Sequence, residues 1–283
     1  MYRKNKTMDT NIKRNIIGIL VVFLVLLPVN SHCDNPSKEQ IEQWTKQAEQ
    51  GDAQAQVILG FIYDQGLVVR QDYGEAVKWY RLSAAQGNVK AQVNLGAMYA
   101  NGCGVKKDYA EAMRWYRLAA AQGDARAQFN IGLKYDTGEG VKKDYAEAMR
   151  WYRLAAAQGD APAQFNIGAM YYNGQGVKQD FKEVARWFRL AAEQGMPEAQ
   201  VKLGALYAKG RGVRQDLGEA DKWFRLAAEQ GLPDAQFLIG LAYLEGQGLQ
   251  QNKRQAKEWF RKAADKGYQP ASEAYRKLND AGY

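Results

Sequence analysis

The stretch GVKKDYAEAMRWYRLAAAQGDA, residues 104–125, occurs again without a single change at residues 140–161, which is a displacement of 36 residues. The same interval separates the members of a tryptophan column (Trp79, Trp115, Trp151, Trp187, Trp223, Trp259) and of a tyrosine column (Tyr63, Tyr99, Tyr135, Tyr171, Tyr207, Tyr243). Glycine follows it from Gly60 to Gly240, from Gly66 to Gly246 and from Gly87 to Gly267. A period between about 20 and 50 residues is typical of a solenoid, in which each unit buries its apolar face against its neighbours.

Each unit contains two segments with helical spacing of apolar residues, 89–101 and 109–122 in the second unit. The second segment begins with a capping-box pattern in every unit, at Asp72/Glu75, Asp108/Glu111, Asp144/Glu147, Asp180/Glu183, Asp216/Glu219 and Asn252/Gln255. It ends at the glycine of the Gly87 column, since glycine tolerates the left-handed conformation that closes a helix. The first helix begins after Asn88, Asp124 or Asp160, or near Pro197 or Pro233. Two antiparallel helices per unit are predicted.

Glycine also lies inside the first predicted helix, for example at Gly96 and Gly132. It costs about 1 kcal/mol relative to alanine there, so close approach of a neighbouring helix with a bulky Trp or Tyr is the expected compensation. A larger side chain at such a glycine is predicted to overpack that crossing.

The motif AQVNLGAMYANGCGV followed by DYAEAMRWYRLAAAQG, residues 91–105 and 108–123, resembles the Sel1-like repeat, a relative of the tetratricopeptide repeat. The resemblance implies an all-α, right-handed α-solenoid of six 36-residue helix-turn-helix repeats that binds proteins and performs no reaction. The repeats are assigned to residues 52–87, 88–123, 124–159, 160–195, 196–231 and 232–267. Residues 34–51 and 268–283 are predicted to be capping helices, because terminal units need a polar outer face.

The N-terminal segment has the features of an export signal. Five Lys or Arg residues precede the apolar run IIGILVVFLVLL at residues 16–27, which is too short to span a bilayer. Cleavage after Ser31 is expected, giving a periplasmic or secreted chain without a stable membrane span. An uncleaved anchor and a lipoprotein modified at Cys33 are the alternatives. Loss of residues 1–31 would remove five basic residues and one acidic residue, so the net charge would fall from +8 to +4, which does not indicate nucleic-acid binding.

The sequence offers little material for catalysis or for a cofactor. None of the four serines begins a Ser-x-x-Lys motif, and the sole histidine, His32, lies near the cleavage site. No cofactor or metal is therefore expected, and the chain is predicted not to be an enzyme. The alternative is an envelope enzyme or binder of peptidoglycan fragments or β-lactams, as suggested for some cysteine-rich Sel1-like relatives. Cys103 is interpreted as an incidental loop thiol, with a disulfide as the alternative.

The candidate binding face comes from positions of the first helix that vary between units at a spacing that places them on one helical side. In tetratricopeptide-like stacks the first helices line the concave surface, which by resemblance carries over to Lys90, Asn94, Asn101, Arg126, Asn130, Asn166 and Asn173. Asn94, Asn130 and Asn166 share one column, and similar repeats use asparagine there to hold the backbone of an extended peptide. An amide offers both donor and acceptor to a peptide bond. The alternative is that these asparagines hydrogen-bond within their own helix pair.

Two sets of basic residues also follow the repeat. A candidate basic ridge of loop residues consists of Arg70, Lys106, Lys107, Lys142, Lys143, Lys178 and Arg214. It would suit an acidic protein or an anionic envelope polymer, whereas a solvated ridge is the alternative interpretation. An arginine column runs from Arg81 to Arg261 directly after the aromatic pair. It is interpreted as structural, with arginine stems over aromatic rings and guanidinium groups paired to carboxylates of adjacent units.

Overall fold

The computed structural model describes residues 36–247 and 249–283, and every element in those ranges is a helix. The helices are α2 (Lys38–Glu49), α3 (Ala53–Gln65), α4 (Tyr73–Ala85), α5 (Val89–Asn101), α6 (Tyr109–Ala121), α7 (Ala125–Thr137), α8 (Tyr145–Ala157), α9 (Ala161–Asn173), α10 (Phe181–Glu193), α11 (Pro197–Lys209), α12 (Leu217–Glu229), α13 (Pro233–Glu245), α14 (Lys253–Ala264) and α15 (Gln269–Asp280). The predicted signal segment 1–31, Cys33 and His32 lie outside the described residues.

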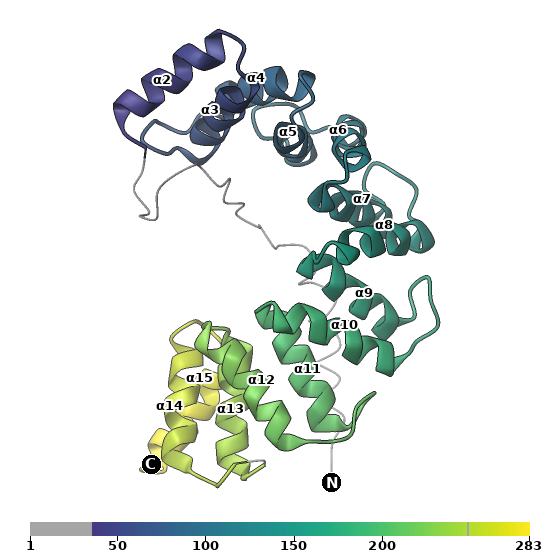
Figure 1. Ribbon diagram of the computed structural model, residues 1–283. Coiled ribbons are helices and arrows are strands. Elements are labelled where there is room, and N and C mark those ends of the chain that lie inside the picture. Colours follow the sequence, from purple (N-terminus) through teal and green to yellow (C-terminus); the bar gives the residue numbers. More distant parts are fainter. Residues whose placement is uncertain (1–35, 248) are drawn as a thin grey trace.

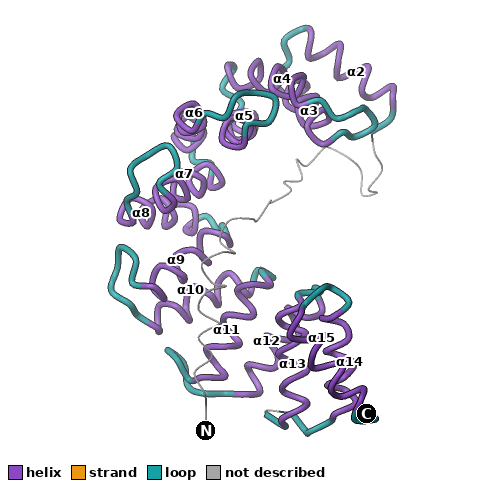
Figure 2. Tube along the Cα trace, turned by 180° about the vertical axis from the view of Figure 1, so that it is seen from behind, coloured by secondary structure: helices purple, strands orange, loops and turns teal. Residues whose placement is uncertain are grey.

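The helices stack into one continuous arc (Figure 1). Each first helix packs on the second helix of its own repeat, as α5 does on α6, and that second helix packs on the first helix of the next repeat. In the N-terminal half, α3, α5 and α7 lie toward the inside of the arc and α4, α6 and α8 toward the outside, an arrangement that Figure 2 shows again from behind. The chain is thus an all-α solenoid, as the repeat period predicts.

The helix ends follow the predicted signals, with one difference. Asp108 accepts hydrogen bonds from the backbone of Ala110 and Glu111 at 2.9 and 3.1 Å, and the equivalent Asp or Asn caps each second helix. The reciprocal half of the capping box does not form in these helices. Instead, the glutamate side chain pairs with a basic residue three positions on, as Glu111 does with Arg114 at 3.1 Å. The carboxylate is therefore engaged along the helix rather than at its start.

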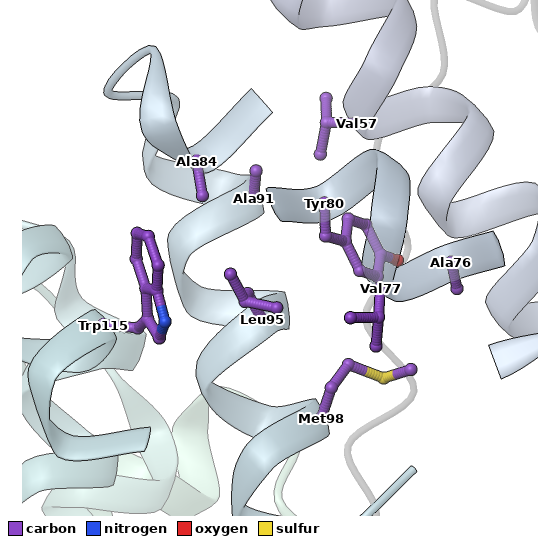
Figure 3. Close-up of a cluster of buried hydrophobic side chains, with 9 residues drawn as sticks. All are labelled: Val57, Ala76, Val77, Tyr80, Ala84, Ala91, Leu95, Met98 and Trp115. Carbon is purple, nitrogen blue, oxygen red and sulfur yellow. The ribbon is translucent and has the colours of Figure 1, made fainter. Parts of the chain in front are cut away.

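The glycines inside the first helices lie against the rings of a Tyr/Phe column in the second helices. A Cβ atom added at Gly96 would lie 2.6 Å from Tyr116, and one added at Gly132 would lie 2.7 Å from Tyr152. The predicted compensation is confirmed, and its partner is the residue after the tryptophan rather than the tryptophan itself. Figure 3 shows the cluster around one such ring, in which Tyr80 of α4 lies near Val57 of α3 and Leu95 of α5.

Replacement of Gly132 by alanine is expected to lower the free energy of unfolding by about 1 to 3 kcal/mol, because the new methyl group meets the buried ring of Tyr152. Chemical denaturation measures the change. The control is Gly74→Ala on the exposed start of α4, where equivalent repeats already have Ala110 and Ala146. That change should be neutral or should stabilise by up to about 1 kcal/mol. Equal effects of the two substitutions would show that backbone entropy, and not the ring contact, sets the cost.

A column of buried glutamines joins successive repeats. Gln200 is 3% exposed, and its amide donates to the carbonyl of Ala192 in the preceding repeat at 3.2 Å. Its oxygen accepts from Gln230, whose amide also reaches the carbonyl of Gly195. In the first five repeats, the oxygen of the equivalent first-helix glutamine accepts from the glutamine that ends the second helix. The first-helix glutamines are buried in all six repeats: Gln56, Gln92, Gln128, Gln164, Gln200 and Gln236. These side chains satisfy carbonyls at the ends of the second helices.

The terminal helices α2 and α15 cover the two ends of the stack. At the N-terminal end, Ile41 and Trp44 of α2 contact a cluster that contains Ile58, which is 3% exposed. Ile58, which occupies in repeat one the position of Asn94 in repeat two, therefore belongs to the core and not to an open face. At the other end, Leu278 and Tyr275 of α15 pack with Phe260 of α14.

Candidate functional site

The variable positions of the first helices in repeats two to four are carried by α5, α7 and α9, of which α5 and α7 lie toward the inside of the arc. Asn94, Asn130 and Asn166 are all half-buried there, at equivalent positions of the three helices. The other candidates lie on the same helices: Lys90 and Arg126 are half-buried, whereas Asn101 and Asn173 are exposed. Arg126 has the carboxylate of Asp124 at 3.7 Å, and Asn173 donates to Gln175 at 3.3 Å.

Two of the three asparagines are engaged by tyrosines of the preceding repeat. Burial raises the pKa of Tyr80 well above its ordinary value, the charge of Asp64 adds to the effect, and a hydrogen bond from Asn94 opposes it. Tyr152 has the same surroundings, with Asp136 and Asn166. Each of these two tyrosine hydroxyls donates a hydrogen bond to the aspartate carboxylate at 3.4 Å. Asn94 and Asn166 thus interact with a tyrosine of the preceding repeat, across the seam between repeats.

Asn130, in the middle of the column, differs from its two neighbours. The position that holds an aspartate beside Tyr80 and Tyr152 is occupied by Ala100 beside Tyr116. The side chain of Asn130 forms no hydrogen bond within the described part of the chain. Burial alone raises the pKa of Tyr116, the tyrosine at the matching place. The amide of Asn130 therefore keeps its hydrogen-bonding capacity on the inner face, between two asparagines that are held in position.

The column ends at Lys202 in repeat five, where a half-buried lysine replaces asparagine. Burial lowers the pKa of Lys202, the charge of Asp234 opposes that shift, and Lys209 adds to it. The inner face consequently changes from neutral amides in repeats two to four to a partly desolvated cation in repeat five.

The residues of the candidate basic ridge are all exposed, and they lie in the loops that follow one another along the edge of the arc (Figure 2). Two of them fold back onto their own helices: the Lys107 and Lys143 ammonium groups each lie 4.6 Å from the ring centroid of Tyr109 and Tyr145. Hydrogen bonding to these tyrosines raises the pKa of both lysines. The ridge is present as a row of solvated cations, and nothing in this geometry selects a ligand for it.

The arginine column binds partners other than those expected. Arg81 donates to the hydroxyl of Tyr99 at 2.9 Å, and Arg117, Arg153 and Arg189 reach Tyr135, Tyr171 and Tyr207 of the next repeat. The predicted pairing with carboxylates of adjacent units is wrong for the arginines of the described residues. Only Arg225 among them has a carboxylate, that of Asp221 in its own helix at 2.7 Å. The next repeat offers a phenol at this place because the tyrosine column recurs at the same period.

One surface feature escaped the sequence analysis. Among the described residues, nine large hydrophobic side chains are exposed, and five of them form a single column in the second helices: Leu82, Leu118, Leu154, Leu190 and Leu226, each 37–45% exposed. The signal was available, because leucine follows the arginine column in five consecutive repeats. A leucine beside buried alanines is ordinarily assigned to the core, so the spacing alone did not reveal its exposure.

Between residues 36 and 283, apart from the undescribed residue 248, no group of three or more His, Cys, Asp or Glu side chains is placed to hold a metal ion. The helices of this range have at most 13 residues and are too short to cross a bilayer. Cys103 is a half-buried free thiol in the loop after α5. The surfaces that remain as candidates are the inner face, the basic ridge and the outer helices.

A stack of helix pairs with an inner face of variable polar residues defines the class of helical repeat proteins that present an extended surface to other proteins. The chain belongs to the Sel1 repeat family: the model described as "Sel1 repeat" matches residues 53–88, 89–124, 125–160, 161–196, 197–232 and 233–268. Proteins with this fold generally mediate protein–protein interaction and are typically non-catalytic scaffolds.

Two solved structures illustrate the similarity. The chain is 36% identical to a Sel1 repeat protein from Oxalobacter formigenes, with a TM-score of 0.71 over 80% of this chain and 90% of that one. It is 35% identical to c5321, a protective antigen of uropathogenic Escherichia coli with an SLR fold, with a TM-score of 0.56 over 86% of this chain and 60% of that one. A search of curated proteins gave no match.

Proposed function

We propose that the chain is an exported, non-catalytic scaffold that holds an extended peptide of a protein partner along the inner face of the arc. The observation that supports this proposal is the amide column of Asn94, Asn130 and Asn166 in three successive repeats. Amides bind a peptide backbone irrespective of its side chains, because each has a donor and an acceptor. Export is the part of the proposal that rests on the sequence of residues 1–31 alone.

The surroundings of the column favour binding over a purely structural role. Asn94 and Asn166 are each oriented by a buried tyrosine, which reduces the conformational entropy lost when a ligand binds. A hydrogen bond to tyrosine uses one part of an amide and leaves its remaining donor and acceptor capacity. Asn130 lies between them with its side chain unengaged by described residues. A peptide laid across α5, α7 and α9 would meet the three amides in succession.

Changing Asn94, Asn130 and Asn166 together to alanine is expected to weaken partner capture at least tenfold, about 1.4 kcal/mol. The measurement is quantitative affinity capture from envelope extracts with the mature chain as bait. The single change Asn130→Ala should account for a measurable part of the loss without altering the melting temperature, because it breaks no hydrogen bond of the described structure.

The control for this experiment is the pair Glu193→Ala and Glu229→Ala, which removes two exposed side chains from the second helices α10 and α12. It should leave capture unchanged. Capture that is equally strong with all three asparagines replaced would place the interface elsewhere and would refute the peptide column. Intact-mass measurement of periplasmic protein tests export separately, since a retained Met1 is incompatible with cleavage.

A further inference from the structure

The second helices of five repeats carry a row of exposed leucines that the inner-face function does not use. Leu82, Leu118, Leu154, Leu190 and Leu226 come one each from α4, α6, α8, α10 and α12, and α4, α6 and α8 lie on the outside of the arc (Figure 1). Soluble proteins commonly expose single apolar residues, but here five consecutive repeats expose a leucine at the same position of the second helix.

Beside each of the first four leucines lies an arginine whose position is fixed and whose charge is not neutralised. The guanidinium groups of Arg81, Arg117 and Arg153 lie 2.9, 3.5 and 3.1 Å from the tyrosine hydroxyls of the next repeat, and Arg189 makes the same contact. Within the described residues, none of the four has a carboxylate oxygen within 4.0 Å. A phenol orients the guanidinium and leaves its positive charge uncompensated.

The other basic column of these helices is different. Lys78, Arg114, Arg150, Arg186 and Lys222 lie one turn before the leucines, and each is paired with a glutamate three positions earlier. The positive charge without a carboxylate partner next to the leucines is therefore that of the four arginines that are hydrogen-bonded to tyrosine. One turn after the leucines, the first three repeats have the exposed alanines Ala85, Ala121 and Ala157. Across these repeats the surface beside the leucines is apolar and basic.

We propose that this Arg–Leu row, defined as Arg81–Leu82, Arg117–Leu118, Arg153–Leu154 and Arg189–Leu190, is a second docking surface that binds an acidic, leucine-bearing segment of a protein partner. Charge complementarity determines the occupant: an oriented guanidinium donates hydrogen bonds to a carboxylate in bidentate geometry, and the adjacent leucine buries an aliphatic side chain. Since this surface faces away from the inner face, the chain can hold two partners at once, one on each side of the arc.

The probe for this surface is a fluorescein-labelled synthetic peptide of about 20 residues, built from leucine on one helical face and glutamate on both flanks. Fluorescence anisotropy with the purified chain is expected to show saturable, salt-sensitive binding. A peptide with lysine for glutamate, and one with serine for leucine, should bind at least tenfold more weakly. Leu118→Ser with Leu154→Ser, and separately Arg117→Gln with Arg153→Gln, should each weaken binding of the acidic peptide at least tenfold.

The matched control is Arg114→Gln with Arg150→Gln, which removes the same charge from the same helices at the paired column and should reduce binding less than threefold. If the two pairs of arginine substitutions weakened peptide binding equally, the effect would come from net charge alone, and the Arg–Leu row would be refuted. Absence of binding, or binding that survives all four row substitutions, would refute it as well. Flotation with vesicles of phosphatidylglycerol that is lost in the row variants, without peptide binding, would assign the surface to a membrane. A dimer dissociated by Leu118→Ser would assign it to a second copy.

Discussion

Tyr152→Ala is expected to lower the free energy of unfolding by about 3 to 5 kcal/mol, the range observed when a large buried aromatic residue is truncated. Tyr152 is 0% exposed, and its ring fills the space left by Gly132 and packs against Phe129 with the ring centroids 5.7 Å apart. The truncation leaves a cavity between α7 and α8 and deprives the half-buried carboxylate of Asp136 of its phenol. Equilibrium denaturation, monitored by circular dichroism, gives the change.

Tyr152→Phe is the matched control, because it keeps the ring and removes only the hydroxyl. Repeats four to six already have phenylalanine in this column, at Phe188, Phe224 and Phe260. The control should therefore cost about 1 kcal/mol, the usual contribution of one hydrogen bond. A cost of more than half that of Tyr152→Ala would mean that the hydroxyl network, rather than the ring, holds the repeat together.

The location of the damage is a separate part of the same expectation. Repeats contact only their neighbours, so loss of Tyr152 should loosen α7, α8 and α9 before the ends of the stack. Hydrogen exchange measured by mass spectrometry resolves these segments. Uniform acceleration of exchange from α2 to α15 would contradict nearest-neighbour stacking and would indicate a single cooperative unit.

The fold was predictable because its signals are local. The Asn88 cap and the glycine after Asn101 define α5 as Val89–Asn101, the range expected from the sequence. The glycine–aromatic contact was also predictable in kind, since a glycine inside a helix needs a compensating neighbour. The boundaries of a single short helix would be ambiguous from sequence, but the same pattern occurs six times and therefore defines them.

The side-chain partners across the seams were not predictable in the same way. Whether Arg81 meets a carboxylate or Tyr99 depends on how one repeat is rotated on the next, and no spacing within a repeat encodes that rotation. The glutamate of the first five capping boxes has two partners within reach, the backbone at the helix start and the basic residue three positions on, and in the structure it pairs with the basic residue. The exposure of the leucines has the same origin, because it follows from which face of α6 or α8 remains uncovered.

The glutamine column gives the second large effect. Gln200→Ala is expected to lower the free energy of unfolding by about 1 to 3 kcal/mol, because it removes the two hydrogen bonds of a side chain that is only 3% exposed. One bond goes to the carbonyl of Ala192, which keeps the backbone N–H of Gly195 at 2.9 Å, and the other comes from the amide of Gln230, which keeps the carbonyl of Gly195. The column spans the seam between repeats four and five, so the loss should also reduce the coupling between α10 and α11.

Repeat six supplies a natural comparison for this prediction. Gln236 is 5% exposed and donates to Ala228 at 3.2 Å, but position 266 is lysine instead of glutamine. Lys266 donates to the carbonyl of Gly231, and the side-chain oxygen of Gln236 has no partner among the described residues. Gln236→Ala should therefore cost about 1 kcal/mol less than Gln200→Ala, since one hydrogen bond fewer is lost.

Lys266→Gln should restore the missing donor and thereby raise the cost of Gln236→Ala to that of Gln200→Ala. A double-mutant cycle that combines Lys266→Gln with Gln236→Ala, measured by chemical denaturation, isolates this coupling from the weaker stability of a terminal repeat. We expect a coupling energy of about 1 kcal/mol in favour of the introduced glutamine, which corresponds to the hydrogen bond that Lys266 does not make to Gln236. A coupling energy of zero would mean that the column only fills space, and that the contact between helices α13 and α14 needs no polar link.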